Sequence, residues 1–437
     1  MLLRFGVGNF RSICGYQEFS LISDSAIKDR VDTLINANAP SVHDPLLPVA
    51  VIYGANASGK SNLLRAFDYL RRQVLFSHSE ATHLRTIESQ PFRLDLESQS
   101  KPTACDLDFV WENVRYHYGF LLFGEEFVGE WLYDFANGRK RVLYERKGPL
   151  SSDVSFGSSI PTNAHDLATF MRPDSLLASV AAQNNFGGRF PVALWARSVT
   201  SEMAAASGMR GMFRNPRYSR LMRSDKIDQR IVEFLKIINT GISSFKFLDE
   251  KSERFDVNLS RQAQLQIGLG LDRDVLKDRN FDTVRRLYAV HDSRGGDPVA
   301  FDINEESSGT QRIFMLLDLI FSSLDRGSPL FVDEMDSSLH TLVGQKVLDL
   351  FMSKRTNPLG SQLVMTTHDT NLMGHDALRR DQIWFTEKDN FGATHVFPLT
   401  DFKARKGQNV EKGYLEGRFG AIPYSGDFSR FLAKVEE

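Results

Sequence analysis

The clearest chemical pattern in the chain runs from Gly54 to Ser61, where GANASGKS matches GxxxxGK[ST]. Glycines let the backbone curl so that N–H groups point at phosphate oxygens, and the positive end of a following helix adds to the attraction. Lys60 would reach the β- and γ-phosphates of a nucleotide, and Ser61 would bind Mg²⁺. An ordinary Gly/Ser turn matches the pattern by chance in about one sequence of this length in a hundred. The residues expected to contact nucleotide here are Asn56, Ser58, Gly59, Lys60, Ser61 and Asn62.

Two carboxylates follow the apolar stretch 329–332. An acid at the end of such a strand can hold the Mg²⁺ shell, which is the role expected of Asp333. The adjacent Glu334 can polarise the attacking water as general base. Alone, an apolar strand that ends in two acids is common, so this motif gains its weight from the others.

A third apolar stretch, 362–367, ends at His368. We expect this histidine to contact the γ-phosphate and to sense its loss, although a lone histidine at a strand end is more often structural. Ligands bind at the carboxyl ends of parallel strands, and here three strands end in phosphate-type chemistry. That convergence favours the functional interpretation.

Ser307-Ser308-Gly309-Thr310-Gln311 stands directly before an apolar helix predicted over 313–324. Small residues with free N–H groups at a helix start bind anions, so Ser308 and Gly309 are candidate nucleotide contacts. A simple N-cap on a core helix explains the same residues, and a helix can be both capped and functional.

These residues need a framework to position them. Residues 47–53 are continuously apolar and predict a buried parallel strand, and 62–76 have helical spacing. Residues 1–25 look extended, and 90–150 alternate like antiparallel strands with one solvated face. The segment 165–245 looks helical, without a coiled-coil heptad run, and 250–303 returns to strand-like patterns. From 304 onward strands and helices alternate, which implies a parallel sheet.

These patterns predict three regions: an N-terminal lobe over 1–165, a helical insertion over 166–248 and a C-terminal lobe over 249–437. Hydrophobic residues make up 42% of the 437, enough for a sizeable core. A formal net charge of −2 argues against coating nucleic acid by bulk charge, although a local patch stays open. Cys14 and Cys105 are far apart without a CxxC partner, so neither a disulfide framework nor a zinc cluster is expected. No membrane span or secretory signal is visible, which predicts a cytoplasmic protein.

GANASGKS, SSGTQR, LFVDEMDSSLH and TTHD resemble the Walker A, signature, Walker B with D-loop, and switch-histidine motifs of ABC-type ATPases, in particular SMC, RecF and OLD-like proteins. The resemblance implies an α/β ATPase head with a parallel core sheet, an antiparallel β lobe and a helical insertion. It implies hydrolysis of ATP, rather than GTP, with Mg²⁺ as cofactor.

In that family the signature of one subunit closes over the γ-phosphate held by another. Ser308 and Gly309 would therefore act in trans, and ATP would join two copies of the chain. Thr310 replaces the second glycine of LSGGQ, a variant of the RecF/OLD-like branch. The opening NFRSI resembles a first strand whose basic residue approaches the nucleotide, here Arg11 unless it is a surface arginine. Gln90 is the candidate for the metal-binding Q-loop glutamine, with an ordinary loop residue as the alternative.

The run KGYLEGRFGAIP at 412–423 resembles the tail of RloA- and AbiL-type ATPases of bacterial phage-defence operons, and INTGISSF at 238–245 fits the same group. This resemblance implies a regulatory, abortive-infection ATPase that controls a separate nuclease or toxin. About seventy residues follow His368 without an acidic cluster for two metals, so a nuclease would come from another chain.

The alternative is a RecF-like DNA-repair or DNA-binding ATPase. It rests on a basic stretch with interleaved aromatic residues that could bind phosphates, although a solvated helix face or a partner-docking loop is the more ordinary explanation of such a stretch. Membrane transport fits less well, because no span is visible. The basic residues are Arg210, Arg214, Arg217, Arg220, Arg223, Lys226 and Arg230.

Overall fold

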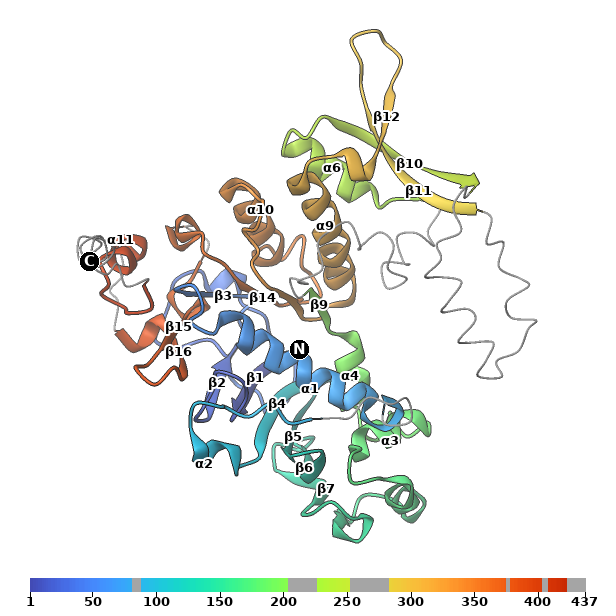
Figure 1. Cartoon of the computed structure of the whole chain (residues 1–437), viewed down its shortest axis with the longest axis vertical. Helices are drawn as coiled ribbons and strands as arrows, with labels where there is room; N and C mark the ends of the chain where they lie inside the picture. Colours follow the sequence, from blue (N-terminus) through green and yellow to red (C-terminus); the bar gives the residue numbers. More distant parts are fainter. Residues whose placement is uncertain (81–87, 203–225, 252–282, 375–377, 403–407, 423–437) are drawn as a thin grey trace, which may run out of the picture. The chain divides into compact units, whose positions relative to one another are not determined.

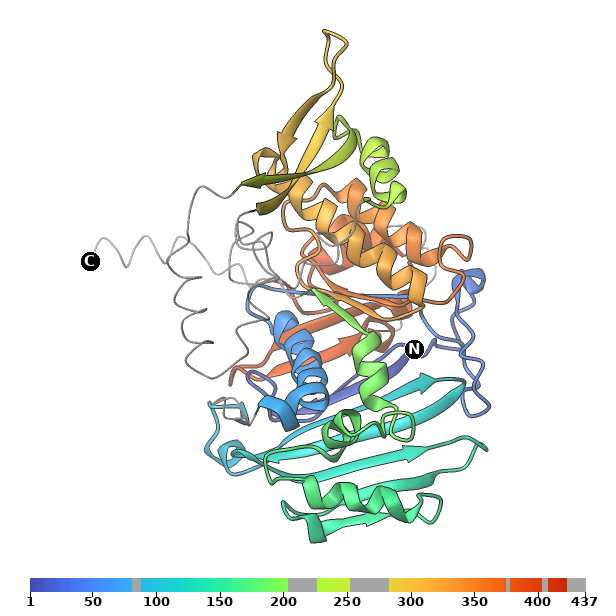
Figure 2. The same ribbon diagram turned by 90° about the vertical axis from the view of Figure 1, so that its right-hand side faces the viewer.

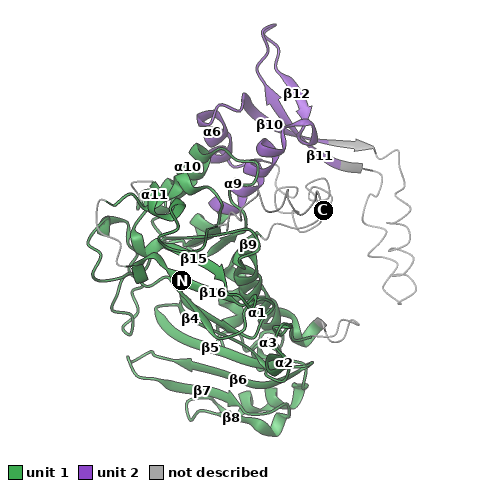
Figure 3. Ribbon diagram, turned by 60° about the vertical axis from the view of Figure 1, so that its left-hand side comes forward, with its two compact units in different colours: residues 1–204, 322–437 green, residues 205–321 purple. Residues whose placement is uncertain are grey.

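The structure, a computed structural model of the chain, describes residues 1–437 except 81–87, 203–225, 252–282, 375–377, 403–407 and 423–437 (Figure 1). The chain forms two compact units (Figure 3). The first contains residues 1–204 and 322–437, and the second contains residues 205–321. The boundary falls inside helix α9 (Ser308–Arg326).

A six-stranded sheet in the first unit carries the strand ends expected to hold the site. Five strands run parallel, and β16 is antiparallel to β15 at one edge. The expected parallel core sheet is thereby confirmed. Its three central motif-bearing strands, β3, β14 and β13, are buried along their whole length, as their continuous apolar sequences predict. In spatial order the strands are β16 (Thr394–Pro398), β15 (Ile383–Lys388), β3 (Val49–Gly54), β14 (Leu363–Thr366), β13 (Leu330–Val332) and β9 (Thr200–Glu202).

The second sheet of this unit has seven antiparallel strands and is the expected β lobe. Alternate residues face the core, for example Cys105, Leu107 and Phe109, which are fully buried. In spatial order the strands are β2 (Gln17–Ser20), β1 (Leu2–Gly8), β4 (Thr103–Trp111), β5 (Val114–Phe123), β6 (Glu126–Asp134), β7 (Arg141–Arg146) and β8 (Val154–Phe156).

Helix α1 (Lys60–Glu80) lies between the two sheets and joins their cores (Figure 2). Its Phe67 ring meets Phe5 of β1 edge-on at 5.5 Å and stacks on Phe331 of β13 at 3.8 Å. Such aromatic pairs add to the apolar area buried between the layers. The helix that starts at the phosphate-binding pattern therefore contacts both sheets through Phe67.

The compact units divide the chain at other places than the boundaries expected at 165 and 248. Helices α3 (Leu177–Gln183) and α4 (Val192–Ser198) pack against α1, so residues 166–204 belong to the first unit. Trp195 of α4 is buried against Phe67. Helical periodicity indicates which face of a helix is buried but not which core buries it, and this is why the segment looked like a separate insertion.

The described part of the second unit is mixed rather than helical. It contains helix α6 (Gln229–Ile237), the start of α9, and an antiparallel sheet of β10 (Ile242–Lys251), β11 (Thr283–His291) and β12 (Val299–Asp302). The ring of Phe245 on β10 packs at 4.7 Å from that of Phe314 on α9.

The remaining short elements of the described chain connect the sheets and helices. Within the described residues, no helix is both long enough and apolar enough to cross a membrane. The elements are α2 (Leu96–Gln99), α10 (Thr341–Met352), α11 (Val410–Leu415), η1 (Val31–Thr33), η2 (Ser151–Asp153), η3 (Thr162–Phe170), η6 (Ile303–Glu305), η7 (Thr370–Gly374), η8 (Arg380–Gln382) and η9 (Leu399–Phe402).

Candidate functional site

Three adjacent parallel strands end at the same edge of the six-stranded sheet. β3 lies beside β14, and β14 lies beside β13, with Ile52 opposite Thr366 and Met365 opposite Val332. The phosphate-binding pattern begins at the end of β3, the two acids follow β13, and His368 follows β14 by two residues. The topology thus brings the three predicted motifs together at the carboxyl edge, where ligands of parallel sheets bind.

The loop between β3 and α1 requires its glycines. A Cβ on Gly54 would lie 2.5 Å from the carbonyl oxygen of Thr386. Gly59 has φ 112°, and a Cβ there would meet the Cγ2 of Thr394 at 2.5 Å. Only glycine fits such a backbone against these neighbours. The loop therefore forms a tight cradle whose N–H groups are available to an anion at the start of α1.

Lys60 folds back over this cradle. Its Nζ donates to the carbonyl oxygens of Gly54 at 2.8 Å and Ala55 at 3.1 Å. Burial lowers the pKa of Lys60 to about 8, and the nearby carboxylates of Asp333, Asp336 and Glu334 oppose that shift. Phosphate oxygens entering the cradle would replace the two carbonyl partners and favour the charged form of the ammonium, which raises its pKa again.

Two hydroxyl groups meet on one carboxylate oxygen. The Ser61 hydroxyl donates to Oδ1 of Asp333 at 3.0 Å, and the Thr366 hydroxyl donates to the same atom at 2.7 Å. Asp333 is 1% exposed. A serine hydroxyl beside a buried carboxylate is the hard oxygen set that Mg²⁺ uses together with substrate phosphates. Among the described residues, no group of three His, Cys, Asp or Glu side chains could hold a metal ion without such a substrate.

Thr366 contacts both acids of the site, and the sequence patterns do not predict this role. Besides donating to Asp333, its Oγ1 accepts the backbone N–H of Glu334 at 2.7 Å. The hydroxyl thus orients both acids, although it lies on a different strand. The only hint of this role in the sequence is a pair of hydroxyl residues, Thr366 and Thr367, at the end of an otherwise apolar strand. Threonine is common in strands, so this pair alone does not indicate a functional site.

The two neighbouring acids have different environments. Asp333 is buried, whereas Glu334 is exposed and has φ 52°, a left-handed backbone in which the chain turns sharply out of the strand. Non-glycine residues in this conformation are uncommon in proteins as a whole, but those that occur are often found at functional sites. The turn separates a carboxylate suited to a metal shell from one that can meet a water molecule.

His368 lies in the same electrostatic neighbourhood. Its backbone N–H donates to Oδ1 of Asp336 at 3.1 Å. Burial, followed by the Lys60 ammonium, lowers the pKa of His368 below its ordinary value, while Asp336, Glu334 and Asp333 oppose the shift. The imidazole is therefore neutral at neutral pH and can donate one hydrogen bond to an anion.

Arg11 and Gln90 contact each other. Nε of Arg11 donates to Oε1 of Gln90 at 2.6 Å, and the Arg11 backbone N–H donates to the Gln90 carbonyl at 2.7 Å. Asn62 in the first turn of α1 donates to Oγ of Ser12, so this pair lies beside the helix start. The amide oxygen expected as a metal ligand is engaged by Arg11 here, and the metal role of Gln90 stays a prediction.

The signature residues lie in the second unit, whereas the loop and the acids lie in the first. Ser307 caps α9, because its Oγ accepts the Thr310 N–H at 3.1 Å, which confirms the N-cap interpretation for this residue. Gln311 ties the preceding turn through the Glu306 carbonyl at 2.8 Å. Ser308 is exposed on the first turn of the helix.

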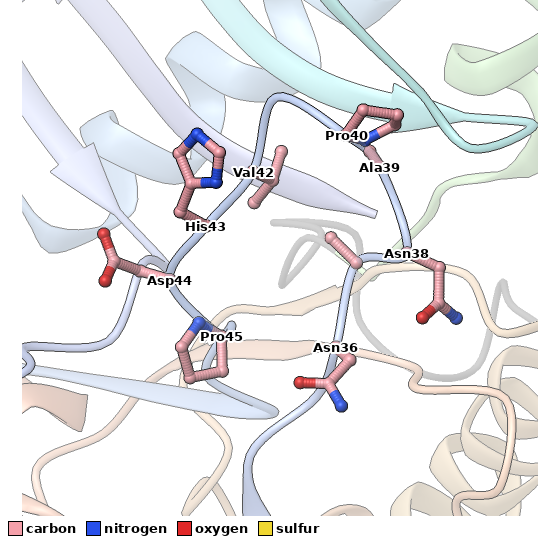
Figure 4. A pocket seen from close by; sticks show the side chains of 9 residues that line it. Asn36, Asn38, Ala39, Pro40, Val42, His43, Asp44 and Pro45 are labelled. Atoms are coloured by element: carbon pink, nitrogen blue, oxygen red, sulfur yellow. The ribbon is translucent and has the colours of Figure 1, made fainter. Parts of the chain in front are cut away.

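Most of the basic stretch, from Arg210 to Arg223, falls outside the described residues. Arg230 forms an ion pair with Asp228 at 2.6 Å, and its guanidinium lies 4.6 Å from the centre of the Phe321 ring. Both contacts are internal to the second unit. A separate hollow in the loop 36–45, lined only by residues of that loop, contains none of the expected site residues (Figure 4).

Comparison of the chain with known protein families and solved structures shows to which family it belongs. Residues 49–374, about three quarters of the chain, match the family model described as "AAA domain, putative AbiEii toxin, Type IV TA system". No curated protein matches the chain.

Two similar solved structures are SMC head domains. The one from Thermotoga maritima is 12% identical, with 91% of this chain and 98% of that chain covered and a TM-score of 0.38. The one from Pyrococcus furiosus, which has an extended coiled coil bound to the C-terminal domain of ScpA, is 13% identical, with 95% and 99% covered and a TM-score of 0.38. The extent of the family match decides the assignment: the chain belongs to this AAA ATPase family, which is named for AbiEii-type toxins of type IV toxin–antitoxin systems.

Proposed function

We propose that this chain binds and hydrolyses ATP with Mg²⁺ and acts as a regulatory ATPase of a bacterial anti-phage system. The observation that carries the proposal is the convergence of Ser61 and Thr366 on Oδ1 of Asp333, directly beside the glycine cradle and Lys60. This convergence supports the proposal because groups suited to bind phosphate, groups suited to bind a metal ion and a carboxylate suited to act as base lie at one sheet edge, which is the combination that nucleotide hydrolysis requires.

Each residue has a defined part in this mechanism. The loop N–H groups and Lys60 hold the phosphates, with Asn56, Ser58 and Gly59 forming the cradle. Ser61 and Asp333 would hold Mg²⁺, which supplies positive charge to the phosphate oxygens when bound. Glu334 accepts a proton from the attacking water, whose oxygen bonds to the γ-phosphorus as the bond to the bridging oxygen breaks. ADP and inorganic phosphate leave, and the neutral His368 donates to a γ-phosphate oxygen during the step.

The site is proposed to be completed by a second copy of the chain. Ser308 and Gly309 stand at the start of the nineteen-residue helix α9, where exposed N–H groups favour an anion. In trans they would close over the γ-phosphate, so that ATP holds two copies together and hydrolysis releases them. Arg11 would approach the nucleotide from beside the start of α1.

The biological output is proposed to be control of a separate nuclease or toxin effector. The support is the toxin–antitoxin description of the family, together with the resemblance of the motifs and tail to abortive-infection ATPases. ATP-driven closure and opening would then act as a switch on the effector.

The test is affinity purification of the Glu334→Gln variant from its native host with ATP and Mg²⁺, followed by mass spectrometry. A stoichiometric nuclease- or toxin-like protein that is lost when Lys60 is also changed to Ala is the expected result. Co-purification of DNA with repair proteins, and of no such effector, would overturn the defence role in favour of a RecF-like ATPase. Failure of the wild-type protein to hydrolyse ATP would remove the basis of both.

A further inference from the structure

The turn that carries His368 is held on both sides. Before the turn, Asp336 accepts the His368 backbone N–H at 3.1 Å. Two residues after His368, the Thr370 hydroxyl donates to Oε1 of Glu411 at 3.1 Å. Asp336 follows the acidic strand of the site, but Glu411 comes from helix α11 near the end of the described chain. The turn that follows His368 is therefore in contact with the C-terminal part of the protein.

The described C-terminal segment, residues 408–422, is folded on itself by internal contacts on both sides of Glu411 in the chain. Asn409 caps α11 by accepting the Lys412 N–H at 2.8 Å, and the Tyr414 hydroxyl donates to the Ala421 carbonyl at 3.0 Å. A Cβ on Gly413 would lie 2.9 Å from the Phe419 ring, so glycine allows the segment to fold tightly on itself. The Glu411 side chain is thus presented from a folded unit.

The same segment docks on β15 and on β3, the strand that leads into the phosphate-binding loop. The Tyr414 ring stacks on Phe385 of β15 at 5.5 Å and an interplanar angle of 9°, and the Phe419 ring stacks on the same ring at 6.0 Å. Tyr414 also lies 6.2 Å from Tyr53, the residue before Gly54. Stacked aromatic rings stabilise a contact by more than the burial of their apolar area alone, so these contacts anchor the segment well.

A buried hydroxyl group, that of Tyr53 on strand β3, lies close to the turn after His368 and to the C-terminal segment. The Tyr53 hydroxyl is buried and has no hydrogen-bond partner among the described residues. Burial raises its pKa well above the ordinary value, and the carboxylates of Asp369, Asp336 and Glu411 add to the shift. The loop strand, the turn after His368 and the C-terminal segment therefore meet around one phenol.

We propose that Glu411 is a positioning residue for His368, and that the C-terminal segment sets the rate of ATP hydrolysis through its contact with Thr370. The inference rests on the proposed function, because it assigns a means of regulation to the same site. A displacement of about 1 Å in a catalytic group can cost about a hundredfold in rate. Glu411 contacts the turn after His368 rather than Lys60 or Ser61, so the contact acts on the hydrolytic step and not on nucleotide binding.

The experiment compares hydrolysis and binding in single and double variants. Glu411→Ala and Thr370→Val each remove the contact from one side, and Thr370→Ser keeps the hydroxyl. Glu416→Ala is the matched control, since Glu416 lies at the end of the same helix and pairs with Arg418 at 2.7 Å within the segment. Steady-state kinetics give kcat and KM, equilibrium titration gives the affinity for a non-hydrolysable ATP analogue, and thermal melting reports folding.

The expected result is a decrease in kcat of about tenfold for Glu411→Ala and for Thr370→Val, with KM and analogue affinity within about twofold of wild type. The double variant should lose no more than either single variant, because both remove the same contact. Thr370→Ser and Glu416→Ala should retain the wild-type rate.

Wild-type kcat in Glu411→Ala, or additive losses in the double variant, would overturn the inference while leaving the ATPase intact. Equal losses in Glu416→Ala would likewise overturn it, because they would indicate a general effect of the segment. If the wild-type protein itself binds ATP analogues but does not hydrolyse ATP, the proposed function fails first and the inference fails with it.

Discussion

The hydroxyl of Thr366 donates a hydrogen bond of 2.7 Å to Oδ1 of Asp333, the oxygen that also receives the Ser61 hydroxyl. Because Thr366 lies on β14 and Ser61 on α1, the carboxylate is fixed from two separate elements. The same threonine oxygen accepts the Glu334 N–H. The orientation of both acids is therefore determined in part by the neighbouring strand.

Replacement of Thr366 by Val should impair hydrolysis more than binding. The change keeps the side-chain volume but removes the donor to Asp333 and the acceptor for the Glu334 N–H. We expect kcat to fall about tenfold, as it does when residues that orient metal ligands are replaced. The free energy of unfolding should fall by about 1–3 kcal/mol, because a buried carboxylate loses a hydrogen-bond donor. Single-turnover kinetics at saturating ATP would measure the first effect and denaturant unfolding the second.

Thr366→Ser is the control for this prediction, because it retains the hydroxyl at the cost of one methyl group. Its kcat should stay near the wild-type value. A Thr366→Val protein that is folded and hydrolyses ATP at the wild-type rate would contradict the role given to this residue.

Glu334→Gln should bind ATP, hydrolyse it at least about a hundredfold more slowly and accumulate as a closed assembly of two copies. The amide keeps the size of the side chain but cannot accept the proton of the attacking water. Light scattering with and without ATP would detect the assembly, and phosphate release would give the rate. Glu387→Gln, the same change on the exposed end of β15, is the matched control and should behave like wild type. Normal hydrolysis in Glu334→Gln would show that another group is the base.

The central sheet and its motifs were predictable because their signals are local. A continuously apolar stretch, a glycine loop and a helical period follow one another between Val49 and Glu80, and the structure has β3, the loop and α1 there. The acids and His368 were found in the same way, at the ends of short apolar stretches. Parallel strands then bring such ends to one edge without any further information.

Contacts between distant segments were not predictable from local patterns. Thr366 resembles any hydroxyl residue at a strand end until β13 is known to be its neighbour. Glu411 and Thr370 are separated by 41 residues, and neither belongs to a recognisable motif. The helices α3 and α4 were recognised as helical, but their burial against α1 depends on a core formed by other parts of the chain.

Arg11 and Gln90 should act as one unit in nucleotide binding. Gln90 orients the guanidinium through the 2.6 Å contact with Nε, so removal of either side chain should weaken ATP binding by a similar factor, about fivefold, and the double variant should be no worse. Fluorescent-nucleotide titration would measure the affinities. Arg93→Ala, which removes an exposed arginine from the same segment as Gln90, is the charge control. Unchanged affinity in Arg11→Ala would place this arginine outside the nucleotide site.

The lowered pKa of Lys60 predicts that ATP binding is linked to protons at alkaline pH. Burial holds the pKa of Lys60 at about 8, below the ordinary value of 10.5. Between about pH 8 and 10.5 the unfolded chain therefore binds more protons at Lys60 than the folded protein does. The contribution of Lys60 to the free energy of unfolding thus becomes more favourable to the folded state as pH rises through this window. Phosphates in the cradle favour the ammonium form, so the bound state takes up a proton above pH 8. The affinity should therefore fall by up to about tenfold per pH unit above about pH 8. Below this pH the ammonium is already charged, and the link between ATP binding and proton uptake should disappear.

Calorimetry at pH 7 and 8.5, in two buffers of different ionisation enthalpy, would count the protons that are taken up when ATP binds. Lys60→Arg stays charged throughout and should show no such uptake, whereas Lys60→Ala should not bind. Equal proton uptake by the wild type and Lys60→Arg at pH 8.5 would mean that Lys60 is already fully charged before ATP arrives.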